Sequence, residues 1–124
     1  MGASDIYQEL CNEVMILKSI SHNNVILYYG EISMPGIYGF VMEYCSKGDL
    51  HTRIQTEGTL SEQEIKVFLK QMLQTLAYLH ARQIVHRDIK TKNILISNGF
   101  YKLCDFGNSV LLDVCSMLIP YSKL

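Results

Sequence analysis

The chain has 124 residues, 48% of them hydrophobic and 19% charged, with a formal net charge of −1. This length suits one compact domain and is too short for two. The charge is balanced and the Lys and Arg residues are scattered, so we expect no nucleic-acid-binding stripe and no membrane-surface helix. No apolar run approaches the roughly 18 residues of a membrane span, and the first residues lack the features of a signal peptide. An intracellular, cytoplasmic location is therefore the default expectation.

The four cysteines give no sign of a metal or disulfide framework. Cys11, Cys45, Cys104 and Cys115 form no C-x-x-C pair and lie far apart in the chain. Zinc sites and disulfide scaffolds need closer or more regular spacing, so we expect reduced thiols. Cys104, directly before Asp105, either faces a ligand pocket or is a buried structural cysteine, and the second reading is favoured.

The first predicted element is an amphipathic helix. Ile6, Leu10, Val14 and Leu17 recur at helical spacing, and the polar residues 21–24 favour its end. The helix should therefore present one apolar face to a core.

Two strands and a short helical turn are expected next. Residues 25–29 and 37–44 are rich in β-branched and aromatic side chains, and residues 34–36, Met-Pro-Gly, supply turn chemistry between them. These segments predict an antiparallel pair. A short helical turn should then start at Gly48-Asp49.

The strongest helix signal begins at Ser61. Ser61 and Glu64 have the spacing of a capping box, in which each side chain satisfies a free backbone N–H of the other residue. The helix should run to about residue 81 and bury one apolar stripe as a core face. The stripe consists of Ile65, Phe68, Leu69, Met72, Leu73 and Leu76.

A second hairpin is predicted around Asn98-Gly99. Residues 94–96 and 101–103 read as short strands, and Asn-Gly is a pair that tolerates the positive φ angles of a tight hairpin turn. The chain has no internal repeat and no low-complexity linker, so both hairpins should belong to the same domain.

The residues suited to chemistry flank this second hairpin. Phosphoryl transfer to a hydroxyl needs a carboxylate that orients the hydroxyl and accepts its proton, and a cation that offsets charge on the phosphate. Asp88 and Lys90 fit these roles. The reaction also needs a divalent metal held by hard oxygen ligands, which Asn93 and Asp105 offer from the two sides of the hairpin. Phe106 can pack under the first helix, and Gly107 allows a sharp turn.

His-Arg-Asp-x-Lys-x-x-Asn at residues 86–93, followed about a dozen residues later by Asp-Phe-Gly, closely resembles the protein kinase superfamily. Lys90, two places after Asp88, makes the serine/threonine type the better match. The resemblance implies an α+β, partial protein-kinase-like fold that binds ATP and Mg2+. Its elements would be helix C, a small-lobe hairpin, the hinge, helices D and E, the catalytic loop, a second hairpin and part of the activation segment.

The resemblance also carries residue roles onto this chain. Glu13 matches the helix glutamate that pairs with an ATP-anchoring lysine. The remaining positions match either the nucleotide pocket or structural and regulatory positions of the family. Met42 matches the gatekeeper, Glu43 and Cys45 the adenine-binding hinge, Asp49 a ribose contact, Leu95 the residue beneath adenine, and Cys104 a pocket residue. Leu17, Tyr28, His86 and Phe106 match the regulatory stack, with Arg87 and Gly107 as further structural positions. Each hinge or stack residue is also compatible with an ordinary strand or core position.

The chain departs from the family pattern on both sides of these motifs. No glycine-rich loop precedes Glu13, and the first basic residue is Lys18, so Glu13 lacks a cation from its own chain. No Ala-Pro-Glu follows Gly107, and residues 119–122 are at best a shortened remnant of the substrate-docking stretch. We therefore expect a single incomplete kinase domain, with residues 1–44 as a remnant of the small lobe and hinge and residues 45–124 as the first part of the large lobe. Weak or absent catalysis follows.

Two functional hypotheses remain open. The first is an ATP- and Mg2+-dependent serine/threonine kinase that acts on a protein substrate. The second is a catalytically inactive kinase-like scaffold or nucleotide-binding module with a protein partner. His-Arg-Asp-Ile-Lys-Thr-x-Asn is similar to NIMA-related kinases, although Asn108 after Asp-Phe-Gly is atypical. Thr91 and Ser116 are candidates for modification.

Overall fold

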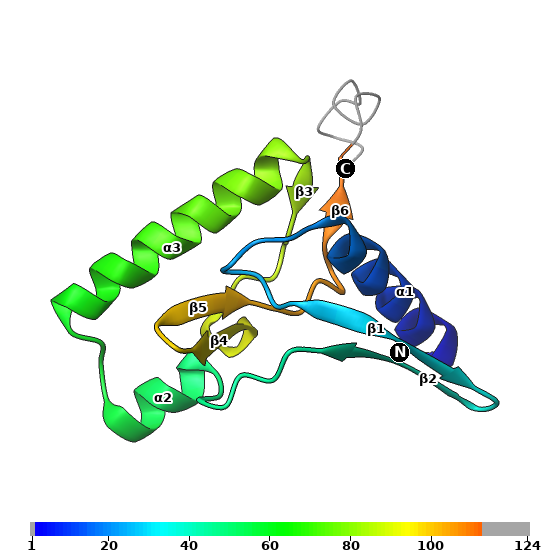
Figure 1. Cartoon of the computed structure of the whole chain (residues 1–124), viewed down its shortest axis with the longest axis horizontal. Coiled ribbons are helices and arrows are strands. Elements are labelled where there is room, and N and C mark those ends of the chain that lie inside the picture. The colour runs from blue at the N-terminus through cyan, green and yellow to red at the C-terminus, as the bar shows by residue number, and fades with distance from the viewer. Residues whose placement is uncertain (1, 113–124) are drawn as a thin grey trace.

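The computed structural model describes residues 2–112, which form an α+β unit with three α-helices and three two-stranded antiparallel sheets (Figure 1). Each sheet pairs only two strands, so the helices and loops supply much of the packing. The expected α+β class is therefore confirmed. Within residues 2–112, no helix is both long and apolar enough to cross a membrane.

Helix α1 spans Ala3–Ser19, as its apolar spacing predicted. Its buried face lies in its second half, at Glu13, Val14, Ile16 and Leu17. Ile6, in the first half, is 50% exposed, so the predicted apolar face is buried only toward the C-terminal end. The backbone becomes extended at Ile20, before the polar segment that was expected to end the helix.

The first hairpin forms as predicted, but its first strand begins later. Strand β1 spans Tyr28–Met34 and pairs antiparallel with β2, Ile37–Met42, around a turn at Pro35-Gly36. The prediction of a strand at residues 25–29 was wrong for most of its length. Val25 and Ile26 are buried, but Val25 makes only an isolated parallel bridge to Leu103. Their β-branched side chains are explained by burial in the core.

Both predicted helix starts are confirmed by their caps. Helix α2 spans Leu50–Glu57, and the carboxylate of Asp49 accepts a hydrogen bond from the Thr52 N–H at 2.8 Å. Helix α3 spans Glu62–Ala81. At its start the Ser61 hydroxyl accepts from the Glu64 N–H at 3.2 Å, and Glu64 accepts from the Ser61 N–H at 2.8 Å. This reciprocal box satisfies two N–H groups that have no partner within the helix.

The buried face of α3 differs from the predicted apolar stripe. Ile65, Leu69 and Leu73 are 42%, 49% and 65% exposed, so the prediction of a core position was wrong for these three. It is confirmed for Met72, which is buried. The buried positions are Met72, Thr75 and Leu79. Thr75 is fully buried, and its hydroxyl donates to the Gln71 carbonyl at 2.7 Å. This hydrogen bond offsets the free-energy cost of burying a hydroxyl group.

The second hairpin matches its prediction closely. Strands β4, Ile94–Ser97, and β5, Phe100–Leu103, pair with Ser97 opposite Phe100. Asn98 and Gly99 both have positive φ, 47° and 82°, as a two-residue hairpin turn requires.

A short sheet that the sequence did not reveal joins β3, Ile84–Val85, to β6, Val110–Leu111. Between β3 and β4, residues Thr91–Asn93 form the 3-10 turn η1. In Figure 1 the β4–β5 hairpin lies between α3 and α1, and the β1–β2 hairpin extends away from α2 and α3. One buried apolar cluster joins these parts, with Leu17, Leu79, Leu103 and Phe106 among its members.

Candidate functional site

The segment between β3 and β4 gathers three of the predicted chemical residues around Asp88. The Asn93 amide nitrogen lies 2.9 Å from the Asp88 carbonyl oxygen and 3.2 Å from its Oδ2. Lys90 Nζ lies 3.6 Å from Asp88 Oδ1. The turn η1 brings Asn93 back toward Asp88, because the Asn93 N–H donates to the Lys90 carbonyl at 2.9 Å. A carboxylate, an ammonium group and an amide thus share one small volume.

His86 anchors this loop from inside the core. It is 1% exposed, and its Nδ1 accepts from the Asp88 N–H at 3.1 Å. Nδ1 therefore carries no proton, and Nε2, 2.9 Å from the Cys104 carbonyl oxygen, donates to it. The imidazole thereby ties the loop at Asp88 to the end of β5. It also contacts the Phe106 ring edge-on, with centroids 4.8 Å apart.

The hairpin brings Asn93 and Asp105 to its open end. The Cys104 N–H donates to the Asn93 carbonyl at 2.9 Å, and Asp105 is the next residue. Asp105 is exposed and takes the left-handed conformation, with φ 58°, which the short Asp side chain tolerates better than most. The positive φ of this turn therefore lies at Asp105 rather than at the predicted Gly107. At Gly107 a Cβ would lie 3.3 Å from Asp105 Oδ1, so glycine is favoured there by close approach.

Helix α1 reaches the same turn through two adjacent polar residues. Glu13 Oε1 accepts from the Phe106 N–H at 3.2 Å. Burial raises the pKa of Glu13, and the Asp105 charge raises it further, although the Phe106 hydrogen bond acts in the opposite direction. No ion pair of Glu13 is found among residues 2–112. The Asn12 amide donates to the backbone beyond Phe106, a contact that the sequence did not suggest.

Asn93 and Asp105 carry oxygen atoms suited to a hard cation. The Asn93 nitrogen faces two acceptors on Asp88, so the amide oxygen is the atom left for another ligand. Amide and carboxylate oxygens are the donors that Mg2+ prefers. The part of the chain that is described holds no group of three or more His, Cys, Asp or Glu side chains that could hold a metal. A Mg2+ ion at these two residues would need its remaining ligands from water or from a bound phosphate, which is how Mg2+ is usually held.

The predicted hinge residues lie along the segment from β2 to α2 and already have protein partners. Glu43 pairs with Lys102 at 2.9 Å and accepts from the Leu27 N–H at 2.8 Å. Asp49 caps α2, and the same residue bridges to Leu95 of β4. Cys45 is buried in the core, whereas Met42 is 40% exposed.

The predicted stack residues are only partly brought together. His86 and Phe106 are in contact, and Leu17 belongs to the same buried cluster. Tyr28 lies at the edge of that cluster and faces Phe40, with ring centroids 6.5 Å apart.

Arg87 and Cys104 occupy structural positions at the ends of the site. Arg87 has φ 69° and donates from Nε to the Asn108 carbonyl at 2.7 Å, which ties the Asp88 loop to the turn after Asp105. Burial raises the pKa of Cys104 to about 12, so its thiol stays protonated and inert near neutral pH. This favours the structural reading of Cys104.

Comparison with known proteins decides the family. The family model described as the protein kinase domain matches residues 2–119. The chain belongs to the protein kinase family. It is 42% identical over 112 residues to a probable serine/threonine-protein kinase of Dictyostelium discoideum, covering 90% of this chain and 23% of that protein. It is 34% identical over 120 residues to mitogen-activated protein kinase kinase kinase 3 of Arabidopsis thaliana, covering 96% of this chain and 20% of that protein.

A third relative is the serine/threonine-protein kinase pakH of Dictyostelium discoideum, 40% identical over 109 residues, with 86% of this chain and 21% of that protein covered. The chain thus spans about a fifth of the length of these relatives. Their names describe whole proteins, and this chain matches one part of each.

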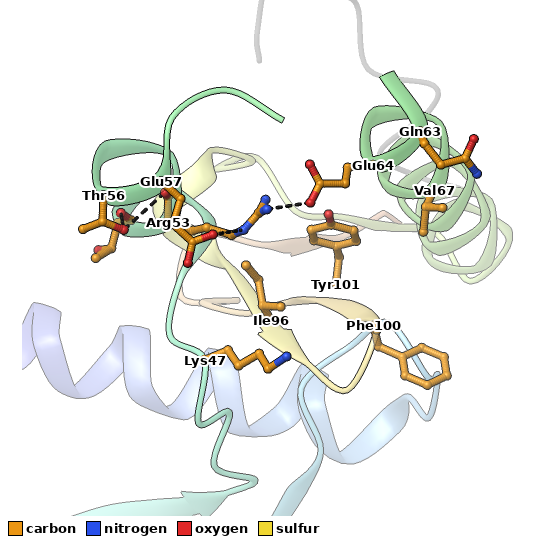
Figure 2. Close-up of a pocket in the computed structure, with 12 residues that line it drawn as sticks. Lys47, Arg53, Thr56, Glu57, Gln63, Glu64, Val67, Ile96, Phe100 and Tyr101 are labelled. Carbon is orange, nitrogen blue, oxygen red and sulfur yellow. Dashed lines mark hydrogen bonds and ion pairs between the residues drawn. The ribbon is translucent and has the colours of Figure 1, made fainter. Parts of the chain in front are cut away.

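A cavity of about 680 Å³ lies away from Asp88 and Asp105 in this kinase-family chain, between α2, α3 and the β4–β5 hairpin (Figure 2). Figure 2 shows Arg53 joined to two carboxylates, Glu57 at 3.1 Å and Glu64 at 2.5 Å. The positive charge of Arg53 is therefore balanced by these two carboxylates. No local pattern of residues indicates this cavity, because its lining comes from three separate segments of the chain. The lining residues include Lys47, Arg53, Glu57, Glu64, Val67, Ile96, Phe100 and Tyr101.

Proposed function

We propose that this chain supplies the catalytic and metal-binding loops of a serine/threonine protein kinase, which transfers the γ-phosphoryl group of ATP to a protein hydroxyl. The observation that carries the proposal is the convergence of Lys90 and Asn93 on the Asp88 carboxylate, at 3.6 and 3.2 Å. Within the protein kinase family, this grouping supplies a base, a cation and a metal ligand within one loop.

Each residue has a definite task in this proposal. Asp88 orients the substrate hydroxyl and accepts its proton. Lys90 offsets negative charge near that carboxylate as the phosphoryl group moves, and its 3.6 Å separation from Asp88 leaves the carboxylate free to accept. The Asn93 amide donates to Asp88 and so fixes the direction in which the carboxylate points.

ATP and Mg2+ are the proposed cofactors. Bound Mg2+ would neutralise phosphate charge, and Asn93 and Asp105 would hold it through their amide and carboxylate oxygens. The adenosine part would lie against Met42, Glu43 and Cys45, with Leu95 beneath adenine. Asp49 would approach the ribose, for which it must share oxygens that now accept from Thr52.

The finer assignments form part of the same proposal. We assign α1 to helix C, the β1–β2 hairpin to the small lobe, α2 and α3 to helices D and E, and β4–β5 to the hairpin between the catalytic and metal loops. Residues 1–44 then belong to the small lobe and hinge, and residues 45–124 to the large lobe. Residues 119–122, Cys115 and Ser116 lie outside the described residues.

The subgroup and the cellular setting are proposed on sequence grounds alone. The segment His-Arg-Asp-Ile-Lys-Thr-x-Asn supports a NIMA-related kinase, whereas the relatives described above carry other names. A protein substrate follows from the proposed activity, and a cytoplasmic location is proposed from the sequence. No nucleic-acid or membrane partner is proposed.

A second candidate is a kinase-like module that binds nucleotide or a protein partner without catalysis. The observation that supports it is that the buried Glu13 carboxylate already accepts a hydrogen bond from the Phe106 N–H, at 3.2 Å. In an active kinase the corresponding glutamate pairs with a lysine that holds ATP.

The two candidates separate in one pair of assays on the full 124-residue chain and its Asp88→Asn variant. Transfer of radiolabelled γ-phosphate to a generic Ser/Thr protein substrate is measured beside Mg2+-dependent nucleotide binding. The kinase proposal expects weak transfer by the parent, and expects Asp88→Asn to lose that transfer while it keeps binding. Binding without transfer in the parent supports the second candidate. Loss of binding in Asp88→Asn would contradict the role given to Asp88.

A further inference from the structure

A single amide side chain from α1 holds the backbone turn that follows Asp105. Asn12 Nδ2 lies 2.8 Å from the Ser109 carbonyl oxygen, 3.2 Å from that of Gly107 and 3.5 Å from that of Phe106. All three partners can only accept, and the amide nitrogen carries two hydrogens, so the two shorter contacts are full hydrogen bonds.

The other polar groups of this turn are satisfied beside that amide. The Phe106 N–H donates to Glu13, at 3.2 Å, while the Phe106 carbonyl accepts from the Ser109 hydroxyl at 2.5 Å and from the Ser109 N–H at 3.1 Å. Phe106 is fully buried and Ser109 is 2% exposed. Little water can therefore replace the Asn12 amide at the Ser109 carbonyl, and that carbonyl would be left without its donor.

The position of Asp105 depends on this turn because its own backbone conformation is unfavourable. Asp105 has φ 58°, a region that is unfavourable for most L-residues, and within residues 2–112 the one hydrogen bond of its exposed side chain is a 3.3 Å contact with the Gly107 N–H. Cys104 anchors Asp105 on its N-terminal side through bonds to Asn93 and His86, and residues 106–109 anchor it on its C-terminal side.

We propose that Asn12 is a positioning residue for the metal site, which holds the carbonyl groups of residues 106–109 against α1 and thereby fixes the direction of the Asp105 carboxylate. This inference rests on the proposed function, because it gives Asp105 the role of a Mg2+ ligand. Two adjacent residues of α1 thus bind this turn: Glu13 accepts from the Phe106 N–H, and Asn12 donates to the carbonyl groups. The spacing of the sequence motifs assigns no role to Asn12.

The first test measures amide hydrogen exchange in the ligand-free full chain. Asn12→Asp keeps the size of the side chain but replaces the donor by a carboxylate that faces carbonyl oxygens. Asn23→Asp makes the same chemical change at an exposed residue and serves as the control. We expect the Phe106 and Ser109 amides to exchange about tenfold faster in Asn12→Asp, the factor that corresponds to one buried hydrogen bond, and to be unchanged in Asn23→Asp.

The second test separates positioning from a merely structural contribution. Thermal unfolding is followed at fixed ADP while Mg2+ is titrated. A structural role would lower the unfolding temperature at all Mg2+ concentrations equally. A positioning role also raises the Mg2+ concentration needed for half of the nucleotide-dependent shift, by about tenfold in Asn12→Asp. Asn12→Gln, which keeps an amide donor on a longer side chain, should recover part of that loss.

The outcomes distinguish this inference from the proposed function. If Asn12→Asp does not fold, Asn12→Ala removes the donor without adding charge and takes its place in both tests. Unchanged exchange at Phe106 and Ser109, or an unchanged Mg2+ midpoint, overturns the positioning role while the proposed function stands. A folded parent chain that shows no Mg2+-dependent response to ADP contradicts both the proposed function and the positioning role of Asn12.

Discussion

Replacing Gln71 by leucine should loosen the attachment of the β4–β5 hairpin to α3. Gln71 Oε1 accepts from the Tyr101 N–H at 2.7 Å and from the Asn24 amide at 2.8 Å, and its Nε2 donates to the Gly99 carbonyl at 3.0 Å. Leucine has a similar volume and removes all three bonds. The Tyr101 N–H then loses its side-chain partner, whereas Asn24 keeps a 2.9 Å bond to the Tyr101 carbonyl and the exposed Gly99 can bond to water.

We expect this substitution to lower the free energy of unfolding by about 2–4 kcal/mol. One unsatisfied buried N–H costs about 1–3 kcal/mol, and the lost Asn24 bond adds about 1 kcal/mol. Gln71→Glu keeps both acceptor contacts and loses only the donor to Gly99, so its cost should be about 1 kcal/mol. Gln74→Leu makes the same apolar change at an exposed position of α3 and is the matched control.

Equilibrium urea unfolding followed by circular dichroism measures these differences, with equal slopes in urea as the check on comparable two-state behaviour. The expected order of stability is Gln74→Leu, then Gln71→Glu, then Gln71→Leu. A Gln71→Leu chain as stable as Gln74→Leu would refute the assignment of Gln71 as the link between α3 and the hairpin.

Three further predictions concern individual side chains. Because the raised pKa of about 12 compares with a reference of 9.0, native Cys104 should react with iodoacetamide at least about a thousandfold more slowly than in the urea-unfolded chain, as measured by mass spectrometry. Folding raises the pKa of Glu13 above its ordinary value of 4.5. The stability that this shift contributes is therefore fully present at a pH well below 4.5 and is lost as the pH rises through the folded-state pKa. Glu13→Gln should therefore unfold at nearly the parent temperature in acid and at a higher one at pH 7, and the opposite order would contradict the direction of the shift. Ser61→Ala should cost about 1 kcal/mol in urea unfolding, since it removes the cap accepting from Glu64; an unchanged midpoint would count against that cap.

Local signals in the sequence predicted the parts of the fold that depend on near neighbours. The capping box at Ser61 and the Asn98-Gly99 turn each involve residues within three positions of one another, and both formed as expected. The motif residues at 86–93 and 105–107 likewise predicted which side chains would gather, because the intervening hairpin is short. Asp88, Lys90 and Asn93 are indeed in contact.

Features that depend on distant pairing were not predictable. Strands β3 and β6 have two residues each, too few for any periodic signal, and they pair across the whole catalytic hairpin. Asn12 and Gln71 look like ordinary polar helix residues in the sequence, yet their amides satisfy backbone groups of remote segments. The α3 stripe misled because apolar spacing identifies a face of a helix without showing whether another element covers it.

The central claim is that Asn93 and Asp105 form a working half-site for Mg2+ and ATP. Its most direct test is the Mg2+-dependent shift in unfolding temperature on adding ATP to the purified chain, beside Asp105→Ala and the control Asp5→Ala in the first turn of α1. We expect a shift in the parent and in Asp5→Ala, and we expect Asp105→Ala to lose it. A folded parent with no response, or an equal shift in Asp105→Ala, would contradict it.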